Sequence, residues 1–103
     1  MINQELAKIF KEIAVFLEIK DVAFKPRAYE KVADIIGSLA EDVKDVYNKG
    51  GLKALETIPG VGAGIAERIE EYIKTGQIKD YDKLKKELPV DIDGLRSVEG
   101  VGP

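Results

Sequence analysis

The chain contains no cysteine and no histidine. It therefore has no disulfide, no thiol nucleophile and none of the usual zinc ligand sets, and any acid–base chemistry would fall to other side chains. It also lacks an apolar run near the roughly 20 residues that cross a bilayer. Charged residues are spread through the first twenty positions, which excludes a secretory signal. We therefore expect a cytoplasmic protein with no membrane contact and no required cofactor.

The charge balance argues against a broad basic surface. Sixteen basic and nineteen acidic residues give a net charge of −3, and the sequence pI is about 5.0. A protein that binds DNA through a lysine-rich face normally has a basic sequence. Nucleic-acid binding would thus need a motif that binds phosphate through N–H groups of the protein main chain. The length of 103 residues, with 45% hydrophobic and 34% charged residues, is typical of a single globular domain, which we expect to be monomeric.

Hydrophobic residues recur at three- and four-residue steps, and no useful stretch alternates with a period of two. The sequence therefore predicts an all-α fold, a compact bundle of four to six short helices. The helices expected within the domain at 1–90 cover about 2–20, 26–39, 42–48, 52–58, 63–74 and 80–88. A further short helix is expected at about 92–98.

Several residues predict where these helices begin, end and face. Asn3 is a plausible N-cap for the first helix, and Pro26 suits the first turn of the second. Gly50 and Gly51 are expected to stop the third helix, and Gly76 to close the helix over 63–74. The residues of the second helix that we expect to face inward are Ala28, Val32, Ile35, Ile36 and Leu39.

The clearest motif is Ile-Pro-Gly-Val-Gly-Ala-Gly-Ile-Ala over 58–66. This is the helix-hairpin-helix pattern, here spanning 52–74. Gly60 and Gly62 allow a tight reversal and bring bare backbone close to a ligand. Val61 would fill the turn, and Ala66 would let the second helix pack closely. The first N–H groups of a helix have no acceptor within it, so with the helix dipole they form an anion site that carries no base specificity.

A second copy of the turn follows forty positions later, as Val-Glu-Gly-Val-Gly over 98–102. It ends at Pro103, before another helix could form. We therefore expect residues 91–103 to be the start of a second, truncated hairpin, and the chain to be a piece of a longer protein.

Taken together, four segments resemble family X DNA polymerases, above all the bacterial and archaeal members. The segments are the opening 3–18, Phe-Lys-Pro-Arg-Ala-Tyr over 24–29, the hairpin at 58–62, and Glu-Glu-Tyr-Ile-Lys-Thr-Gly over 70–76. The resemblance implies the N-terminal DNA-binding domain of a repair polymerase, which holds the 5′-phosphate side of gapped or nicked DNA in base excision repair or replication. Nucleotidyl transfer would lie in a following domain, because no constellation of carboxylates for two metal ions is visible here.

The resemblance also implies particular phosphate contacts. Lys25 and Tyr29 match a phosphate-contacting lysine and tyrosine, and Arg27 adjoins them. The expected DNA-phosphate-binding residues are Lys25, Arg27, Tyr29, Gly60, Gly62, Gly64 and Arg68. Other basic positions of the family fall on Glu56, Gly64 and Asp80.

In animal members of the family this domain is also a 5′-deoxyribose-phosphate lyase that acts through a lysine Schiff base. The matching position here is Arg68, whose guanidinium cannot form the imine, so we expect no catalytic residue at that position. Lys25 or Lys31 could substitute as the amine. Lyase activity with such a lysine is one alternative to simple DNA binding. A helical protein-interaction module, favoured by the net acidity, is another.

Family hairpins hold a monovalent cation, Na⁺ or K⁺, through backbone carbonyls. The matching positions are Glu56, Ile58 and Val61 in the first hairpin and Arg96, Val98 and Val101 in the second.

The remaining charged and aromatic residues have plainer interpretations. Lys83, Lys85 and Lys86 are expected to form a solvated face, and Tyr47, Tyr72 and Tyr81 to lie in the core or at its rim.

Overall fold

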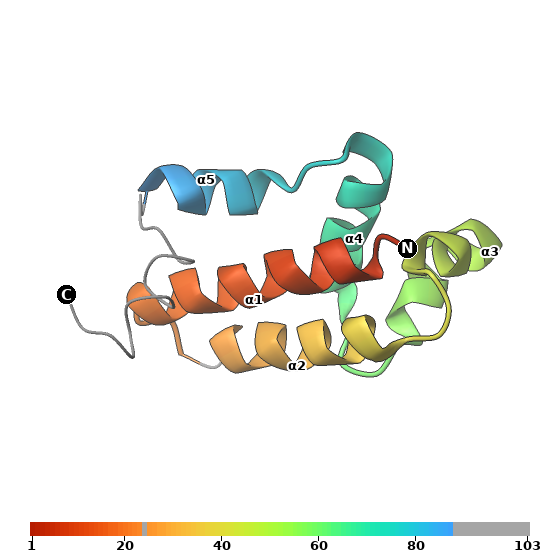
Figure 1. Ribbon diagram of the computed structural model, residues 1–103, viewed down its shortest axis with the longest axis horizontal. Helices are drawn as coiled ribbons and strands as arrows, with labels where there is room; N and C mark the ends of the chain where they lie inside the picture. The colour runs from red at the N-terminus through yellow and green to blue at the C-terminus, as the bar shows by residue number, and fades with distance from the viewer. Residues whose placement is uncertain (24, 88–103) are drawn as a thin grey trace.

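The computed structural model describes residues 1–23 and 25–87, which form five helices and contain no strand. The helices are α1 (Asn3–Ile19), α2 (Lys25–Ser38), α3 (Val43–Glu56), α4 (Ala63–Thr75) and α5 (Lys79–Glu87). In Figure 1, α1 lies between α2 and α5, while α3 and α4 gather at the N-terminal end of α1. The predicted all-α class is confirmed for this part of the chain. The helix expected at 92–98 and the truncated second hairpin lie outside the described residues.

The core is formed where α1 packs on α2 and α4. Its side chains follow the three- and four-residue spacing predicted from the sequence. The largest of them are Leu6, Phe10, Phe16, Ile36, Leu55, Ile69 and Ile78, each at most 2% exposed. Burial of such side chains stabilises a fold by roughly 1.5–3 kcal/mol each relative to leaving them in water. The hairpin residues Ile58, Val61 and Ala66 belong to the same cluster, so the hairpin is part of the core.

Asn3 has a different role from the one the sequence predicted. The N-cap of α1 is Ile2, which provides no side-chain hydrogen bond, and Asn3 is fully buried. Its amide nitrogen donates to the Glu41 carbonyl oxygen at 2.8 Å, and its amide oxygen accepts from the Val43 N–H at 2.9 Å. The prediction was wrong because these two backbone groups, forty positions away, offer Asn3 a buried pair of partners. Asn3 thereby joins the starts of α1 and α3.

Ala28 is exposed, which contradicts its predicted place in the core. The buried residues of α2 are Pro26, Tyr29, Val32, Ala33 and Ile36. Tyr29 takes the inward position next to Ala28, with its ring centroid 5.6 Å from that of Phe10. The large aromatic ring buries more apolar area than an alanine methyl group, so the helix turns Tyr29 inward.

Two glycines set the helix boundaries as expected. Gly51 has a positive φ of 67° inside α3 and breaks it into the two shorter helical pieces that the sequence predicted. Gly76 adopts the left-handed conformation at the C-cap of α4, with its N–H donating to the Tyr72 carbonyl oxygen at 2.8 Å.

Tyrosine–glutamate pairs tie the C-terminal helices to α1. The Tyr72 hydroxyl of α4 donates to Glu5 at 3.1 Å, and the Tyr81 hydroxyl of α5 donates to Glu12 at 2.9 Å. Both tyrosines are half-buried, in keeping with the predicted position at the rim of the core. These pairs hold α4 and α5 over the α1–α2 layer, where the candidate site lies.

Candidate functional site

The hairpin turn runs from the end of α3 to the start of α4. The Thr57 N–H donates to the Ala54 carbonyl oxygen at 3.1 Å, and the Val61 N–H donates to the Ile58 carbonyl oxygen at 3.0 Å. Ile58 and Val61 are buried, at 6% and 5% exposure. The turn is therefore fixed by its own backbone bonds and by two apolar side chains that point into the core.

Gly60 is needed where the turn approaches α2. Its φ is +85°, a conformation that residues with a side chain rarely adopt. A Cβ atom at this position would lie 3.3 Å from a methyl carbon of Val32 and 3.4 Å from the terminal carbon of Ile35. Because Gly60 has no side chain, the hairpin can pack closely against α2.

Gly62 leaves the start of α4 uncovered. It is the N-cap, with extended backbone, and it offers no side chain to the first N–H groups of the helix. A Cβ atom at Gly62 would meet nothing within 4 Å, and Gly64 in the first turn is also exposed. Since these N–H groups lie at the positive end of the helix dipole, this terminus can attract an anion.

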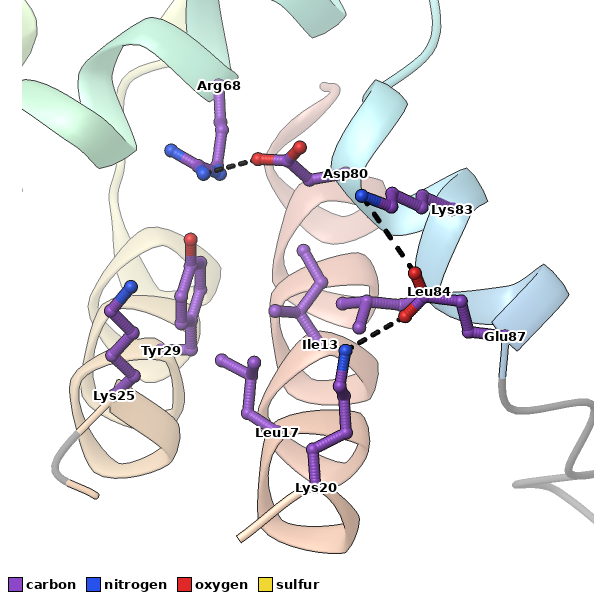
Figure 2. Close-up of a pocket in the computed structure, with 10 residues that line it drawn as sticks. All are labelled: Ile13, Leu17, Lys20, Lys25, Tyr29, Arg68, Asp80, Lys83, Leu84 and Glu87. Carbon is purple, nitrogen blue, oxygen red and sulfur yellow. Dashed lines mark hydrogen bonds and ion pairs between the residues drawn. The ribbon is translucent and has the colours of Figure 1, made fainter. Parts of the chain in front are cut away.

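A pocket of about 200 Å³ lies next to the hairpin, between α2, α4, α5 and the second half of α1. Figure 2 shows its lining side chains. The lining residues are Ile13, Leu17, Lys20, Lys25, Tyr29, Arg68, Asp80, Lys83, Leu84 and Glu87. The structure thus brings Lys25 and Tyr29, from the segment 24–29, to the same place as Arg68 of the hairpin helix.

Tyr29 forms one wall of the pocket. The residue is 8% exposed, and Figure 2 shows its hydroxyl directed toward Arg68. Burial raises the pKa of the Tyr29 phenol above its ordinary value, while the nearby charge of Arg68 acts in the opposite direction. The hydroxyl therefore stays protonated at neutral pH and can donate a hydrogen bond to an anion in the pocket.

Arg68 connects the pocket to the hairpin. One terminal nitrogen of its guanidinium donates to the Gly64 carbonyl oxygen at 2.9 Å, and the other forms an ion pair with Asp80. A guanidinium has five N–H donors in a planar fork, so donors remain for a ligand.

The pocket also holds Lys20 and Glu87, which the sequence did not single out, and Lys83, which was expected only on a solvated face. The Lys20 ammonium donates to Glu87 at 2.8 Å, and the Lys83 ammonium lies 3.9 Å from the same carboxylate. The bond from Lys20 lowers the pKa of the Glu87 carboxyl below its ordinary value. Lys83 and Glu87 lie four residues apart on α5 and meet along the helix. Lys20 follows the last residue of α1, so only the packing of α1 and α5 brings it to Glu87.

The local charge differs in sign from that of the chain. Four basic and two acidic side chains line the pocket, whereas the whole chain has a net charge of −3. The excess of positive charge is thus concentrated beside the uncovered start of α4. This arrangement can bind an anion with charge-assisted hydrogen bonds from several directions.

Residues 1–78 match the helix-hairpin-helix domain family. The chain belongs to this family. The match contains α1 to α4, with the hairpin, and ends before α5.

A DNA polymerase/3′-5′ exonuclease PolX from Bacillus subtilis (strain 168) is 29% identical over 103 residues, which cover 99% of this chain. The chain spans 17% of the length of that relative. This match agrees with the similarity between the sequence motifs and those of family X DNA polymerases.

Two of the candidate residues of this helix-hairpin-helix domain lie away from the pocket. Arg27 lines a separate hollow with Glu18 and Glu30, on another side of α2. Lys31 is exposed and is not among the lining residues of the pocket. The predicted cluster is therefore divided, with Lys25 and Tyr29 on the pocket side and Arg27 outside it.

The predicted cation ligands of the first hairpin lie at its turn. The Ile58 carbonyl oxygen accepts the Val61 N–H, which leaves it one lone pair. Glu56 ends α3, and Val61 lies between the two glycines. The matching second-hairpin residues Arg96, Val98 and Val101 lie outside the described part of the chain. A monovalent cation at the first hairpin stays a prediction.

Residues 1–23 and 25–87 offer neither a cluster of metal ligands nor a membrane-spanning helix. No group of three or more acidic side chains there could hold a metal ion. None of the helices in the same part of the chain combines the length and the apolar character needed to cross a membrane.

Proposed function

We propose that this chain binds DNA through its phosphates, without base specificity, and that its pocket takes the 5′-phosphate at a gap or nick. The observation that carries the proposal is the convergence of Lys25, Tyr29 and Arg68 in one pocket beside the hairpin helix. These side chains offer an ammonium, a neutral hydroxyl and a guanidinium, all of which donate hydrogen bonds to phosphate oxygens.

The hairpin supports binding of the DNA backbone next to the pocket. Gly62 and Gly64 leave the start of α4 without covering side chains, so phosphate oxygens can approach the N–H groups. This mode of binding needs no excess of basic residues over the whole chain. The net charge of −3 is therefore compatible with DNA binding, because the positive charge is local.

The similarity to the Bacillus subtilis PolX protein suggests a role for this domain within a longer polymerase. Its name describes a DNA polymerase and 3′-5′ exonuclease, and this chain matches about a sixth of its length. We infer that the chain serves as the DNA-holding part of a repair polymerase of that kind. The described residues contain no cluster of carboxylates for two-metal nucleotidyl transfer, so we assign that reaction to other parts of such a protein.

Fluorescence anisotropy with a short-gapped duplex tests the proposal. The gap is made with and without a 5′-phosphate, and binding is measured at a low and a moderate salt concentration. We expect the phosphorylated gap to bind about tenfold tighter at low salt, since one or two additional charge-assisted hydrogen bonds form. Both affinities should fall as salt is added.

Lys25→Ala and Lys31→Ala provide a matched pair of variants. Both lysines are exposed on α2, but only Lys25 lines the pocket. We expect K25A to lose most of the preference for the phosphorylated gap and K31A to keep it. Equal binding of the two gaps by the unmodified chain would mean that its pocket does not select the 5′-phosphate, and would leave the hairpin as the binding site. If neither DNA binds at low salt, a protein-interaction module becomes the better explanation.

A second candidate activity is a 5′-deoxyribose-phosphate lyase. Three amines, those of Lys20, Lys25 and Lys83, line the pocket that would hold the sugar phosphate. Lys20 and Lys83 pair with Glu87, whereas Lys25 forms no ion pair with any residue that the structure describes. Lys25 is therefore the best candidate nucleophile, because no carboxylate holds its side chain away from the sugar aldehyde.

Borohydride trapping decides between binding and lyase activity. The amine would condense with the aldehyde carbon and release water, and borohydride would reduce the resulting C=N bond to a stable amine. A lyase gives a covalent protein–DNA adduct that K25A loses and K31A retains. Absence of the adduct, with binding intact, leaves a binding domain.

A further inference from the structure

Both acidic side chains of the pocket belong to α5. Asp80 forms an ion pair with Arg68, and Glu87 accepts a hydrogen bond from Lys20 at 2.8 Å and lies 3.9 Å from the Lys83 ammonium. Figure 2 shows the two carboxylates reaching the pocket from the same helix. One short helix therefore supplies counter-charges to cations from the end of α1, from α4 and from α5 itself.

These pairs engage three of the four pocket cations. Lys25 is the exception within the described part of the chain. The Arg68–Asp80 pair lies at the surface of the pocket, with 29% and 56% of the two side chains exposed. A ligand entering the pocket thus meets cations that already have carboxylate partners.

The helix that carries the carboxylates is lightly anchored. No residue of α5 is fully buried. Its contacts with α1 include the Tyr81 hydroxyl bond to Glu12 and the Tyr81 ring, whose centroid lies 6.5 Å from that of Phe16. The family match ends at residue 78, just before this helix. The Asp80 and Glu87 side chains are themselves 56% and 39% exposed, so the carboxylates can move while Tyr81 and Leu84 stay packed against the core.

We propose that Asp80 and Glu87 are internal counter-anions that compete with a DNA 5′-phosphate for Arg68 and Lys20 and so weaken its binding. The proposal rests on the proposed function and adds its regulation. A terminal phosphate carries a charge near −1.5 to −2 at pH 7, whereas an internal phosphodiester carries one negative charge. Repulsion from Asp80 therefore acts more strongly on the terminal phosphate.

The opposite role for Asp80 would be to orient Arg68 toward the ligand. Arg68 is also held by its hydrogen bond to the Gly64 carbonyl oxygen, so its orientation does not depend on Asp80 alone. Removal of the Asp80 charge should thus free donors of the guanidinium while that bond remains. The two roles predict affinity changes of opposite sign.

Asp80→Asn and Asp82→Asn test the proposal with the same change in net charge. Both residues lie in the first turn of α5, but Asp82 neither lines the pocket nor pairs with a described cation. We expect D80N to bind the phosphorylated gap about three- to tenfold tighter, with a smaller gain for the unphosphorylated gap. D82N should change both affinities by less than about twofold, because Asp82 is partly open to solvent outside the pocket and its charge is screened there.

Glu87→Gln gives a second, independent variant. We expect E87Q to tighten binding of the phosphorylated gap as well, and the D80N/E87Q double variant to bind it at least as tightly as either single variant. A loss of affinity in D80N would overturn the proposal and assign Asp80 the orienting role. Equal gains for both DNAs in D80N and D82N would overturn it too, since they would reflect net charge alone.

The same titrations separate this inference from the proposed function. If the unmodified chain prefers the phosphorylated gap and D80N does not strengthen that preference, only the inference fails. If the unmodified chain shows no preference and D80N acquires one, the counter-anions mask the pocket and the inference holds. If neither protein distinguishes the two gaps, both proposals are rejected.

Discussion

The Arg68 guanidinium donates a 2.9 Å hydrogen bond to the carbonyl oxygen of Gly64, one turn earlier in α4. Gly64 belongs to the hairpin, and Arg68 lines the pocket. The two candidate phosphate sites are therefore parts of one helix, and their separation is set by the rise of that helix. A DNA strand that contacts the hairpin would meet the pocket in a fixed register.

Gly60→Ala should destabilise the fold. The alanine would have to adopt a φ near +85°, with its Cβ 3.3–3.4 Å from Val32 and Ile35. We expect the free energy of unfolding to fall by about 1–3 kcal/mol, measured by urea denaturation.

Gly64→Ala is the matched control in the same hairpin. Its φ is not positive, and the new Cβ would lie at an ordinary 3.6 Å from a nitrogen of Arg68. Since alanine favours a helix over glycine, G64A should be neutral or stabilising by up to about 1 kcal/mol. Equal stabilities of the two variants would contradict the requirement for a glycine at position 60.

Asn3→Ala should also destabilise the chain, by removing the one side chain that bonds to two backbone groups. The Glu41 carbonyl oxygen and the Val43 N–H would lose the bonds of 2.8 and 2.9 Å that Asn3 provides. We expect a loss of about 2–4 kcal/mol in urea denaturation, because two polar groups are left without their partner. Asn48→Ala, at an exposed position of α3, serves as the control and should change stability little. A small effect of N3A would indicate that water replaces the amide.

The sequence was most informative where a local pattern has only one structural solution. The two glycines of the hairpin, with apolar residues at 58, 61 and 66, predicted the turn and its buried side. Helical spacing predicted all five helices and most of the core. In both cases the determining interactions lie within a few residues along the chain.

Predictions from the sequence failed where contacts between distant segments decide which way a side chain faces. Asn3 forms its bonds near Glu41 in place of capping α1, and Ala28 gives the inward position to Tyr29. The pocket could be predicted only in part for the same reason. Lys25 and Tyr29 came from a recognisable motif, whereas Lys20 and Glu87 meet through the packing of α1 on α5.

Tyr29 should make the fold sensitive to alkaline pH. Burial raises the pKa of its phenol in the folded chain above the ordinary value of 10.0. Its contribution to stability is therefore complete below about pH 10 and is lost as the pH rises through the folded pKa. We expect the free energy of unfolding to fall as the pH rises above about 10 in urea titrations. Tyr29→Phe should reduce this fall, and an unchanged pH profile of Y29F would contradict the burial of an ionisable hydroxyl.

Gly62→Asp should change stability and DNA binding in opposite directions. The position is the extended N-cap of α4, and a new side chain there meets nothing within 4 Å. Aspartate would accept a hydrogen bond from the first turn and interact favourably with the helix dipole, so we expect a gain of about 0.5–1 kcal/mol in urea denaturation.

The same carboxylate would stand where the hairpin is proposed to receive a DNA phosphate. We expect G62D to weaken binding of gapped DNA by about tenfold at low salt, because it covers the N–H groups and repels the phosphate. Gly62→Ser caps the helix without charge, so it should give a similar gain in stability with a smaller loss of affinity. If G62D stabilises the chain and leaves DNA binding unchanged, the start of α4 does not contact phosphate, and the hairpin serves only to join α3 and α4.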